Sequence, residues 1–175
     1  NNGDSATAPT DPIREGYVFI GWDKEFDNIT ENIIVTAQYE LTNKPIFIVS
    51  SVTAKAGEEN IKISIDVKQN PNVASIGLTL TYDKSLTLIN ISYNEDIGGY
   101  SMSSEHMTSP VKLTWISPLA NVSGDFTFVT LEFTVAEDAT GNLPIEITYN
   151  PDDVYDMTEE NIEFDVINGS INVVE

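Results

Sequence analysis

The stretch SIGLTLTYDKSLTLINI, residues 75–91, holds the clearest alternation in the chain. Side chains of an extended strand point in turn to opposite faces. One face is apolar and predicts a strand packed on a core: Ile76, Leu78, Leu80 and Tyr82. The other face is small and uncharged: Ser75, Gly77, Thr79 and Thr81. Since threonine is an ordinary strand residue, this bare face fits a plain exposed strand as well as a binding surface.

Similar patterns fill the chain beyond residue 45. Turn-rich stretches separate short apolar runs, and no segment keeps a helical period over two turns. About nine short strands within about 130 residues predict an all-β fold of the β-sandwich class. The candidate strands are residues 46–52, 60–67, 75–82, 86–93, 111–116, 126–135, 143–149, 162–167 and 170–174.

Composition narrows the classes of function. The 175 residues are 41% hydrophobic and 21% charged, which is typical of a globular protein. Eight Lys and Arg against 28 Asp and Glu give a net charge of −20, which argues against a nucleic-acid partner because phosphate backbones are repelled. The absence of cysteine excludes disulfides, zinc–thiolate sites and a cysteine nucleophile. No apolar run approaches the roughly 20 residues of a membrane span.

The N-terminal part of the chain is organised differently. Its two candidate strands, residues 17–22 and 33–39, bury too little apolar surface to fold alone. Because the chain opens without Met or a signal-peptide pattern, we expect it to be a piece of a longer protein. The predicted organisation is a linker at 1–8, a small β-rich unit at 9–41, a second linker at 42–45 and the main domain at 46–175.

Catalytic and metal-binding signals are weak. His106, the single histidine, lies in a polar run without a nucleophile-elbow pattern, which favours an exposed loop residue over a triad member. The acidic loop at residues 150–161 carries five carboxylates, the kind of ligand that binds Ca²⁺. Its spacing lacks the EF-hand pattern and favours a solvated loop. We therefore predict no enzymatic activity and no cofactor in this chain.

Two tryptophans bear on carbohydrate binding. Trp115 shares a side of its strand with Leu113, which predicts a packed ring in the core. Trp22 follows Tyr17 and Phe19 and predicts an anchor for the small unit. An exposed aromatic platform for sugars is therefore disfavoured, although a carbohydrate-binding module remains an alternative.

Neighbouring strands extend the bare face if they lie beside residues 75–82 in one sheet. Most of their outward side chains are small or polar, with Ile116 and Phe128 as the apolar points. The outward sets are Lys112, Thr114 and Ile116 in residues 111–116, Phe128, Thr130, Glu132 and Thr134 in residues 126–135, and Pro144, Glu146 and Thr148 in residues 143–149.

Residues 46–175 resemble a cohesin module, the receptor domain of the scaffold proteins of bacterial cellulosomes. The resemblance rests on four stretches in the family's order. They are VTAKAGEENIKISIDV, VASIGLTLTYDKSLTLINI with its Tyr-Asp after the alternating run, FVTLEFTVAEDATGNLPIEI, and DVYDMTEENIEFDVINGSINV with its Asn-Gly-Ser turn before the last strand.

This resemblance implies a nine-stranded jelly-roll sandwich that binds a dockerin noncovalently. Cohesins use the outer face of the sheet that holds the strand at 75–82, which implies contacts from Ser75 and Gly77, and from Thr114 and Ser117 in and after the strand at 111–116. Many cohesins have Asn and Asp at the first two positions, whereas this chain has Ser and Gly. Calcium is expected in the dockerin, and polysaccharide is expected to be bound only indirectly.

The N-terminal stretch PTDPIREGYVFIGWDKEFDNITENIIVTAQYE resembles the second half of an internalin-type B repeat of bacterial surface proteins. Both resemblances imply an extracellular location, secreted or on a bacterial cell surface. Such a partial repeat is expected to need a partner and offers a route to dimers. A structural or adhesin domain of a surface protein is a further alternative to dockerin binding.

Overall fold

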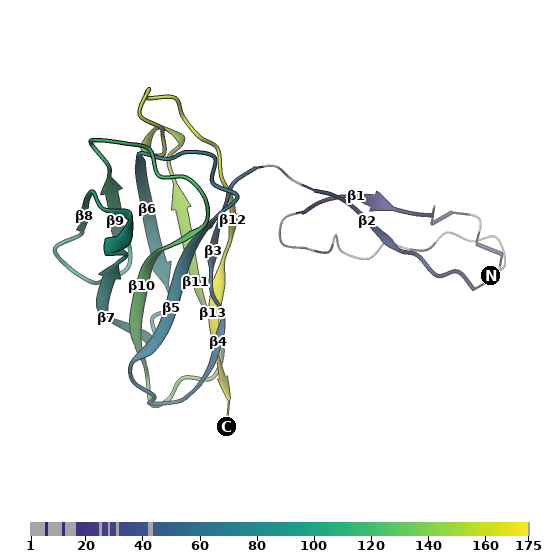
Figure 1. Cartoon of the computed structure of the whole chain (residues 1–175). Coiled ribbons are helices and arrows are strands. Elements are labelled where there is room, and N and C mark those ends of the chain that lie inside the picture. The colour runs from purple at the N-terminus through teal and green to yellow at the C-terminus, as the bar shows by residue number, and fades with distance from the viewer. Residues whose placement is uncertain are drawn as a thin grey trace. The chain divides into compact units, whose positions relative to one another are not determined.

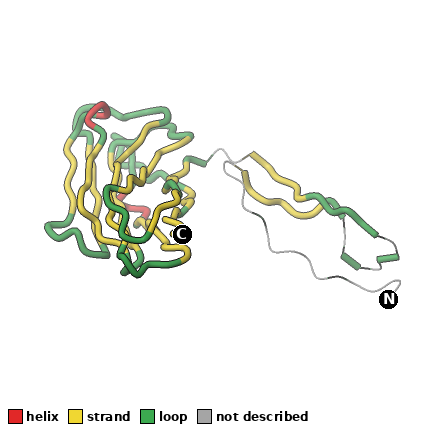
Figure 2. Tube along the Cα trace, turned by 90° about the horizontal axis from the view of Figure 1, so that it is seen from below, coloured by secondary structure: helices red, strands yellow, loops and turns green. Residues whose placement is uncertain are grey.

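Two compact units make up the chain, residues 1–43 and 44–175. The computed structural model describes residues 6, 12, 17–24, 26, 27, 29, 30, 32–41 and 44–174. Strands dominate both units (Figures 1 and 2). Helical structure in the described ranges consists of two 3-10 turns, η1 (Glu95–Ile97) and η2 (Pro151–Asp153), drawn red in Figure 2.

The N-terminal unit is an antiparallel hairpin of β1 (Tyr17–Trp22) and β2 (Ala37–Leu41). Trp22 packs edge-on against the rings of Phe19 and Phe26, so it anchors this unit as predicted. The second strand begins at Ala37 rather than at residue 33. β1 ends at Trp22, which pairs with Ala37, so the residues before Ala37 lie beyond the end of the ladder.

The second unit is a β-sandwich, which confirms the all-β fold expected from the sequence (Figure 1). Its five-stranded sheet has the order β12–β3–β5–β10–β7, formed by Asp165–Ile167, Ile46–Val49, Ile61–Lys68, Phe126–Val135 and Leu86–Tyr93. Its six-stranded sheet has the order β4–β13–β11–β6–β9–β8, formed by Val52–Lys55, Gly169–Val174, Gly141–Tyr149, Ser75–Tyr82, Val111–Ile116 and Tyr100–Ser103.

The core lies between the two sheets and follows from the alternation in the sequence. β6, β7, β9 and β10 have the bounds expected for them. On β6 and β9 every second side chain is buried: Ile76, Leu78, Leu80, Val111, Leu113 and Trp115. Burying one such side chain stabilises the fold by about 1.5–3 kcal/mol. A register shift of one residue would turn the whole apolar row to solvent, and this stabilisation would be lost.

The first strand of the sandwich is divided between the sheets. Residues 46–52 are predicted as one strand, but β3 joins the five-stranded sheet and β4 joins the six-stranded one. The crossing is held by two serines, because Ser50 Oγ accepts from the Ser64 amide at 2.9 Å and Ser51 Oγ from the Ser170 amide at 3.1 Å. This split and the unexpected β8 explain why the sandwich has more strand segments than predicted.

The placement of β10 corrects one expectation. The sequence predicts that the outward face of residues 126–135 belongs to the sheet that holds β6, but β10 lies between β5 and β7 in the opposite sheet. A bulge between Thr127 and Val129 also breaks the alternation, so Phe128 is fully buried against the ring of Tyr93. Thr130 pairs with Ser64 and Ser92, and lies on the other sheet.

Candidate docking surface

The outer face of the six-stranded sheet, here called the docking face, brings together most of the residues expected to bind a partner. Residues directly opposite each other on antiparallel strands share a face. β6 lies between β9 and β11, and its outward residues align with theirs. The pairs are Ser75 with Ile116, Gly77 with Thr114, Thr79 with Lys112 and Thr148, and Thr81 with Glu146.

Ser117 lies just past β9 but is turned into the structure. Its amide donates to the Ala74 carbonyl at 2.7 Å, and its hydroxyl donates to the Ala120 carbonyl at 2.6 Å. Ser117 is only 9% exposed, and its hydrogen bonds hold the turn after β9. Phe128 and Thr130, on the opposite sheet, do not share this surface.

The N-terminal end of β6, which carries Ser75 and Gly77, is covered by the segment that follows β11. β11 leaves the ladder where Tyr149 pairs with Leu78, and the chain returns at Tyr155, which bridges to Ser75. Residues 150–154 between these pairs form a protrusion, here called the acidic bulge. This bulge packs on Ser75 and Gly77, although both residues still line the hollow beside it. The partner contacts implied for these two residues stay a prediction.

Contacts of the acidic bulge explain the small residues beneath it. A Cβ atom on Gly77 would lie 2.8 Å from Cβ of Asp153, so only glycine leaves room for the aspartate. The Ser75 hydroxyl donates to the Asp153 carbonyl at 3.3 Å. Val154 is fully buried, and the Ala74 and Ser75 amides donate to the Tyr155 carbonyl at 2.8 and 3.0 Å. The bulge is thus a fixed part of the sheet surface.

A hollow of about 340 Å³ lies beside the acidic bulge. Asp153 and Tyr155 form one wall, and Thr114 and Ile116 of β9 form the other. Lys112 also lines it, but its Nζ donates to Thr79 Oγ1 at 2.6 Å. Ser75, Gly77 and Leu78 of β6 complete the lining, so the hollow has mixed polarity and holds both a carboxylate and an ammonium group.

β8 was not expected from the sequence, which predicted a polar loop in this region. It pairs with β9 at the edge of the sheet, with Tyr100 opposite Ile116 and Met102 opposite Thr114. Both side chains therefore lie on the docking face, and both are strongly exposed. Alternation of Tyr and Met with serine is the signal that could have identified the strand, but it would have placed the two large residues inward.

Tertiary contacts fix β8 with its large residues outward. Trp115 Nε1 donates to the Gly98 carbonyl at 2.7 Å. Gly99 has φ of +78°, and a Cβ there would lie 2.5 Å from the Ile116 carbonyl oxygen, so the backbone approaches β9 too closely for any side chain. From the opposite sheet, the Tyr93 hydroxyl donates to the Met102 carbonyl at 2.7 Å. Burial raises the pKa of this phenol to about 12.

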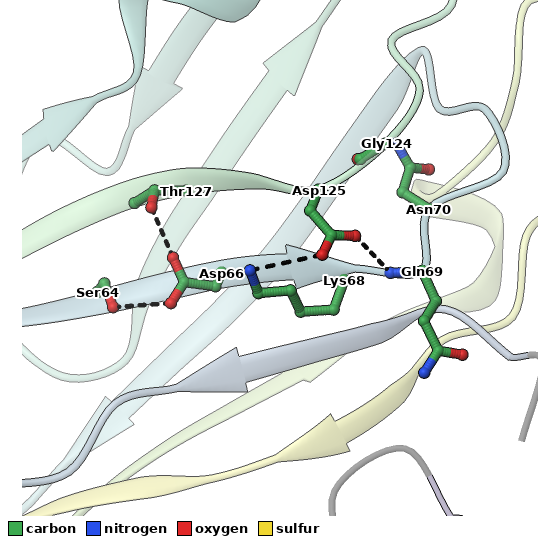
Figure 3. Close-up of polar contacts among 8 residues, drawn as sticks. All are labelled: Ser64, Asp66, Lys68, Gln69, Asn70, Gly124, Asp125 and Thr127. Carbon is green, nitrogen blue, oxygen red and sulfur yellow. Dashed lines mark hydrogen bonds and ion pairs between the residues drawn. The ribbon is translucent and has the colours of Figure 1, made fainter. Parts of the chain in front are cut away.

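The outer face of the five-stranded sheet differs because its polar side chains pair with one another (Figure 3). Asp66 accepts from the Ser64 hydroxyl at 3.0 Å and from the Thr127 hydroxyl at 2.6 Å. Asp125 accepts from the Gln69 amide at 2.8 Å and lies 3.6 Å from Lys68 Nζ. Lys62 and Glu132 add a further ion pair at 3.5 Å. These polar side chains therefore already have hydrogen-bond or ion-pair partners within the chain.

Other candidate sites find little support in the geometry. His106 is exposed in a loop, and the ring of Trp115 is buried. The described residues contain no group of three or more acidic, histidine or cysteine side chains placed to hold a metal ion. In the acidic loop, the Asp156 carboxylate accepts hydrogen bonds from its own turn. The bond from the Thr158 hydroxyl, together with bonds from backbone amides, lowers the pKa of this carboxyl.

Comparison with known families bears on this surface. The family model of the cohesin domain matches residues 46–173. The chain belongs to the cohesin family. Cohesins are non-catalytic binding modules. A comparison with curated proteins gives no match. In the described part of the chain, no helix is long and apolar enough to cross a membrane.

Solved cohesin structures have the same fold as this cohesin. In the Coh-OlpA–Doc918 complex from Clostridium thermocellum, the matched chain is 16% identical with a TM-score of 0.67, over 75% of this chain and 100% of that one. CaCohA2 from Clostridium acetobutylicum is 21% identical with a TM-score of 0.64, over 75% and 91%. A non-cellulosomal cohesin from Archaeoglobus fulgidus is 20% identical with a TM-score of 0.64, over 75% and 92%.

Proposed function

We propose that this cohesin binds a dockerin through the outer face of its six-stranded sheet, and so tethers a dockerin-bearing enzyme or scaffold protein in an extracellular polysaccharide-degrading complex. The observation that carries the proposal is the family match over residues 46–173, joined to a rigid sheet face that is open to solvent beside the acidic bulge. Several of the similar structures are complexes of cohesins with dockerins.

Docking on this face requires little rearrangement. The sheet is held by backbone ladders, and the acidic bulge and β8 are held by the buried Val154 and the Tyr93–Met102 hydrogen bond. A preformed surface loses little conformational entropy on binding, which favours affinity. Calcium belongs to the partner in this proposal, because dockerins fold around Ca²⁺-binding loops, whereas the described residues of this chain contain no group of three or more acidic, histidine or cysteine side chains placed to hold a metal ion.

Calorimetric titration tests this function. The probes are calcium-loaded dockerins encoded in the genome that carries this chain, together with Doc918 and Doc435, and soluble and insoluble polysaccharides. We expect at least one dockerin to bind, binding to be lost in EDTA, and the cohesin's own thermal unfolding to be unchanged by EDTA. Failure of every dockerin would overturn the proposal. Glycan binding in its place would assign the chain to carbohydrate recognition.

The N-terminal hairpin is proposed to be a partial B-repeat that takes no part in docking. Its support is the REGYVFIGW motif, whose aromatic residues Phe19 and Trp22 pack within the unit. A chain that begins at residue 44 keeps the whole sandwich and should bind dockerin with the same Kd. A weaker Kd would show that the hairpin contributes to the interface, and light scattering on both chains tests whether it forms dimers.

A further inference from the structure

Edge strands of the sandwich differ sharply in length. The outermost strands are β12 and β7 in the five-stranded sheet, and β4 and β8 in the six-stranded one (Figure 1). β12 has three residues, and β4 and β8 have four each, whereas β7 has eight. Because an edge exposes unpaired amide and carbonyl groups, short edge strands are one way in which proteins avoid pairing with other chains. β7 lacks this protection.

The sequence of β7 also lacks the residues that usually keep other strands away. LTLINISY contains no charged residue, proline or glycine. Its one irregularity is a bulge at Ile89, where the register with β10 shifts and the side chain is 41% exposed. Among the described residues, no hydrogen bond joins the backbone of residues 89–92 to any segment other than β10. The outer side of β7 is therefore an uncharged row of unpaired backbone groups.

Charges beyond the two ends of β7 favour one occupant and one direction of pairing. Lys84 lies two residues before the strand, and Glu95 and Asp96 begin the 3-10 turn after it. All three are exposed, and none forms an ion pair within the part of the chain that the structure describes. The neighbouring Asp83 accepts from the Ser85 amide of its own turn at 2.7 Å. Antiparallel pairing of two β7 strands places each lysine beside the acidic end of the other strand, whereas parallel pairing brings like charges together.

We propose that the β7 edge binds the β7 edge of a second copy of this chain, in antiparallel pairing about a two-fold axis, so that two five-stranded sheets join into one continuous sheet. The backbone groups of residues 89–92 then find partners, and Ile89 of each copy lies near the axis, close to the midpoint of the strand. Such an interface uses the same surface of both copies and closes at a dimer. No residue of the docking face takes part in it.

Electrostatics restrict self-association to a contact of this kind. Each chain has a net charge of −20, so two copies repel one another over most of their surface. A row of uncharged residues removes this repulsion where the backbones approach, and the oppositely charged ends add attraction. A single strand pair buries little surface, which is typical of a weak interface, so we expect a Kd on the order of 0.1 mM.

Sedimentation equilibrium of the full chain tests the dimer, at concentrations from about 10 µM to about 1 mM in about 0.15 M salt. Ile89→Lys places two ammonium groups near the two-fold axis, and we expect it to weaken dimerisation by about tenfold or more. Ile116→Lys is the matched control, because Ile116 is 40% exposed but lies on the interior strand β9 of the other sheet. The control should dimerise like the parent.

Charge reversal tests the pairing of the strand ends. Lys84→Glu makes both ends of β7 acidic, and Glu95→Lys combined with Asp96→Lys makes both ends basic. We expect each of these two variants alone to dimerise about fivefold more weakly than the parent, or worse. An equimolar mixture of the two should recover the dimer, because every acidic end then meets a basic one. Unchanged dimerisation in both variants would overturn the antiparallel arrangement.

Hydrogen exchange locates the contact. Amide exchange in residues 89–92 should slow as the concentration of the parent rises, and should not change with concentration in Ile89→Lys. A parent chain that stays monomeric at the highest concentration would overturn the inference. A dimer that persists in Ile89→Lys and is lost on removal of residues 1–43 would also overturn it, and would assign self-association to the N-terminal hairpin. Neither result would alter the proposed dockerin binding, which calorimetry measures separately.

Discussion

The two outer faces of the sandwich use the same β architecture in opposite ways. On the five-stranded sheet, Asp66, Asp125 and Glu132 each find a hydroxyl, amide or ammonium partner on the same face. On the six-stranded sheet, Tyr100 and Ile116 point to solvent. Strand composition alone therefore does not identify a binding face. The mark is polar pairing on one face and exposed, uncompensated groups on the other.

The largest effect is expected where the docking face depends on a single glycine. Gly99→Ala places a Cβ 2.5 Å from the Ile116 carbonyl oxygen at a φ of +78°. Because β8 must move away, we expect the free energy of unfolding to fall by about 2 kcal/mol and dockerin affinity to fall by about tenfold or more. Urea unfolding and calorimetry measure the two. Unchanged affinity would show that β8 does not belong to the interface.

A smaller effect is expected beneath the acidic bulge. Gly77→Ala brings a Cβ to 2.8 Å from Cβ of Asp153, so the bulge must shift at a cost of about 1 kcal/mol in the free energy of unfolding. In an Asp153→Gly background the same substitution should cost nothing, since the clashing atoms are gone. A double-mutant cycle by urea unfolding measures the coupling. Additive costs would mean that the bulge does not rest on Gly77.

Tyr93 connects the two sheets through its hydrogen bond to β8. Tyr93→Phe should lower the free energy of unfolding by about 1 kcal/mol at neutral pH. The pKa of the phenol is about 12 in the folded chain and about 10 when unfolded, so the fold favours the neutral form. Its stabilisation is complete below about pH 10 and is lost as the pH rises toward about 12.

Unfolding curves from pH 9 to 12 test the sign of this dependence. Burial also raises the pKa of Tyr82, so both chains lose stability in alkali. The parent should lose more of it than Tyr93→Phe, and the two curves should converge at high pH. Parallel curves would mean that the Tyr93 phenol does not titrate with unfolding.

The smallest effect is expected on the five-stranded face. Lys62→Gln removes an exposed ion pair with Glu132, which is worth about 0.5 kcal/mol or less. Dockerin affinity should stay within about twofold of the parent, because this face lies on the other side of the core. A clear loss of affinity in calorimetry would break the functional contrast between the faces.

Sequence reasoning was most accurate where a single strand decides the outcome. The bounds of β6 and its inward row follow from alternation, which is local to the chain. The sequence prediction was wrong at Phe128, because a bulge interrupts the alternation of buried and exposed residues. It was also wrong at β8, because hydrogen bonds from Trp115 and Tyr93 hold that strand with its large residues outward. The partner contact predicted at Gly77 stays a prediction, and the atom that requires a glycine there belongs to Asp153, far along the chain.

Local sequence pattern was enough to predict the all-β class, the apolar row of each central strand, and which residues of β6, β9 and β11 face away from the core. These follow from side-chain period and burial, which each strand carries locally. Contacts between distant segments place β10 in the opposite sheet, residues 150–154 over Gly77, and Tyr100 and Met102 on the docking face. Those outcomes depend on pairing and close packing between distant segments, which no local pattern encodes.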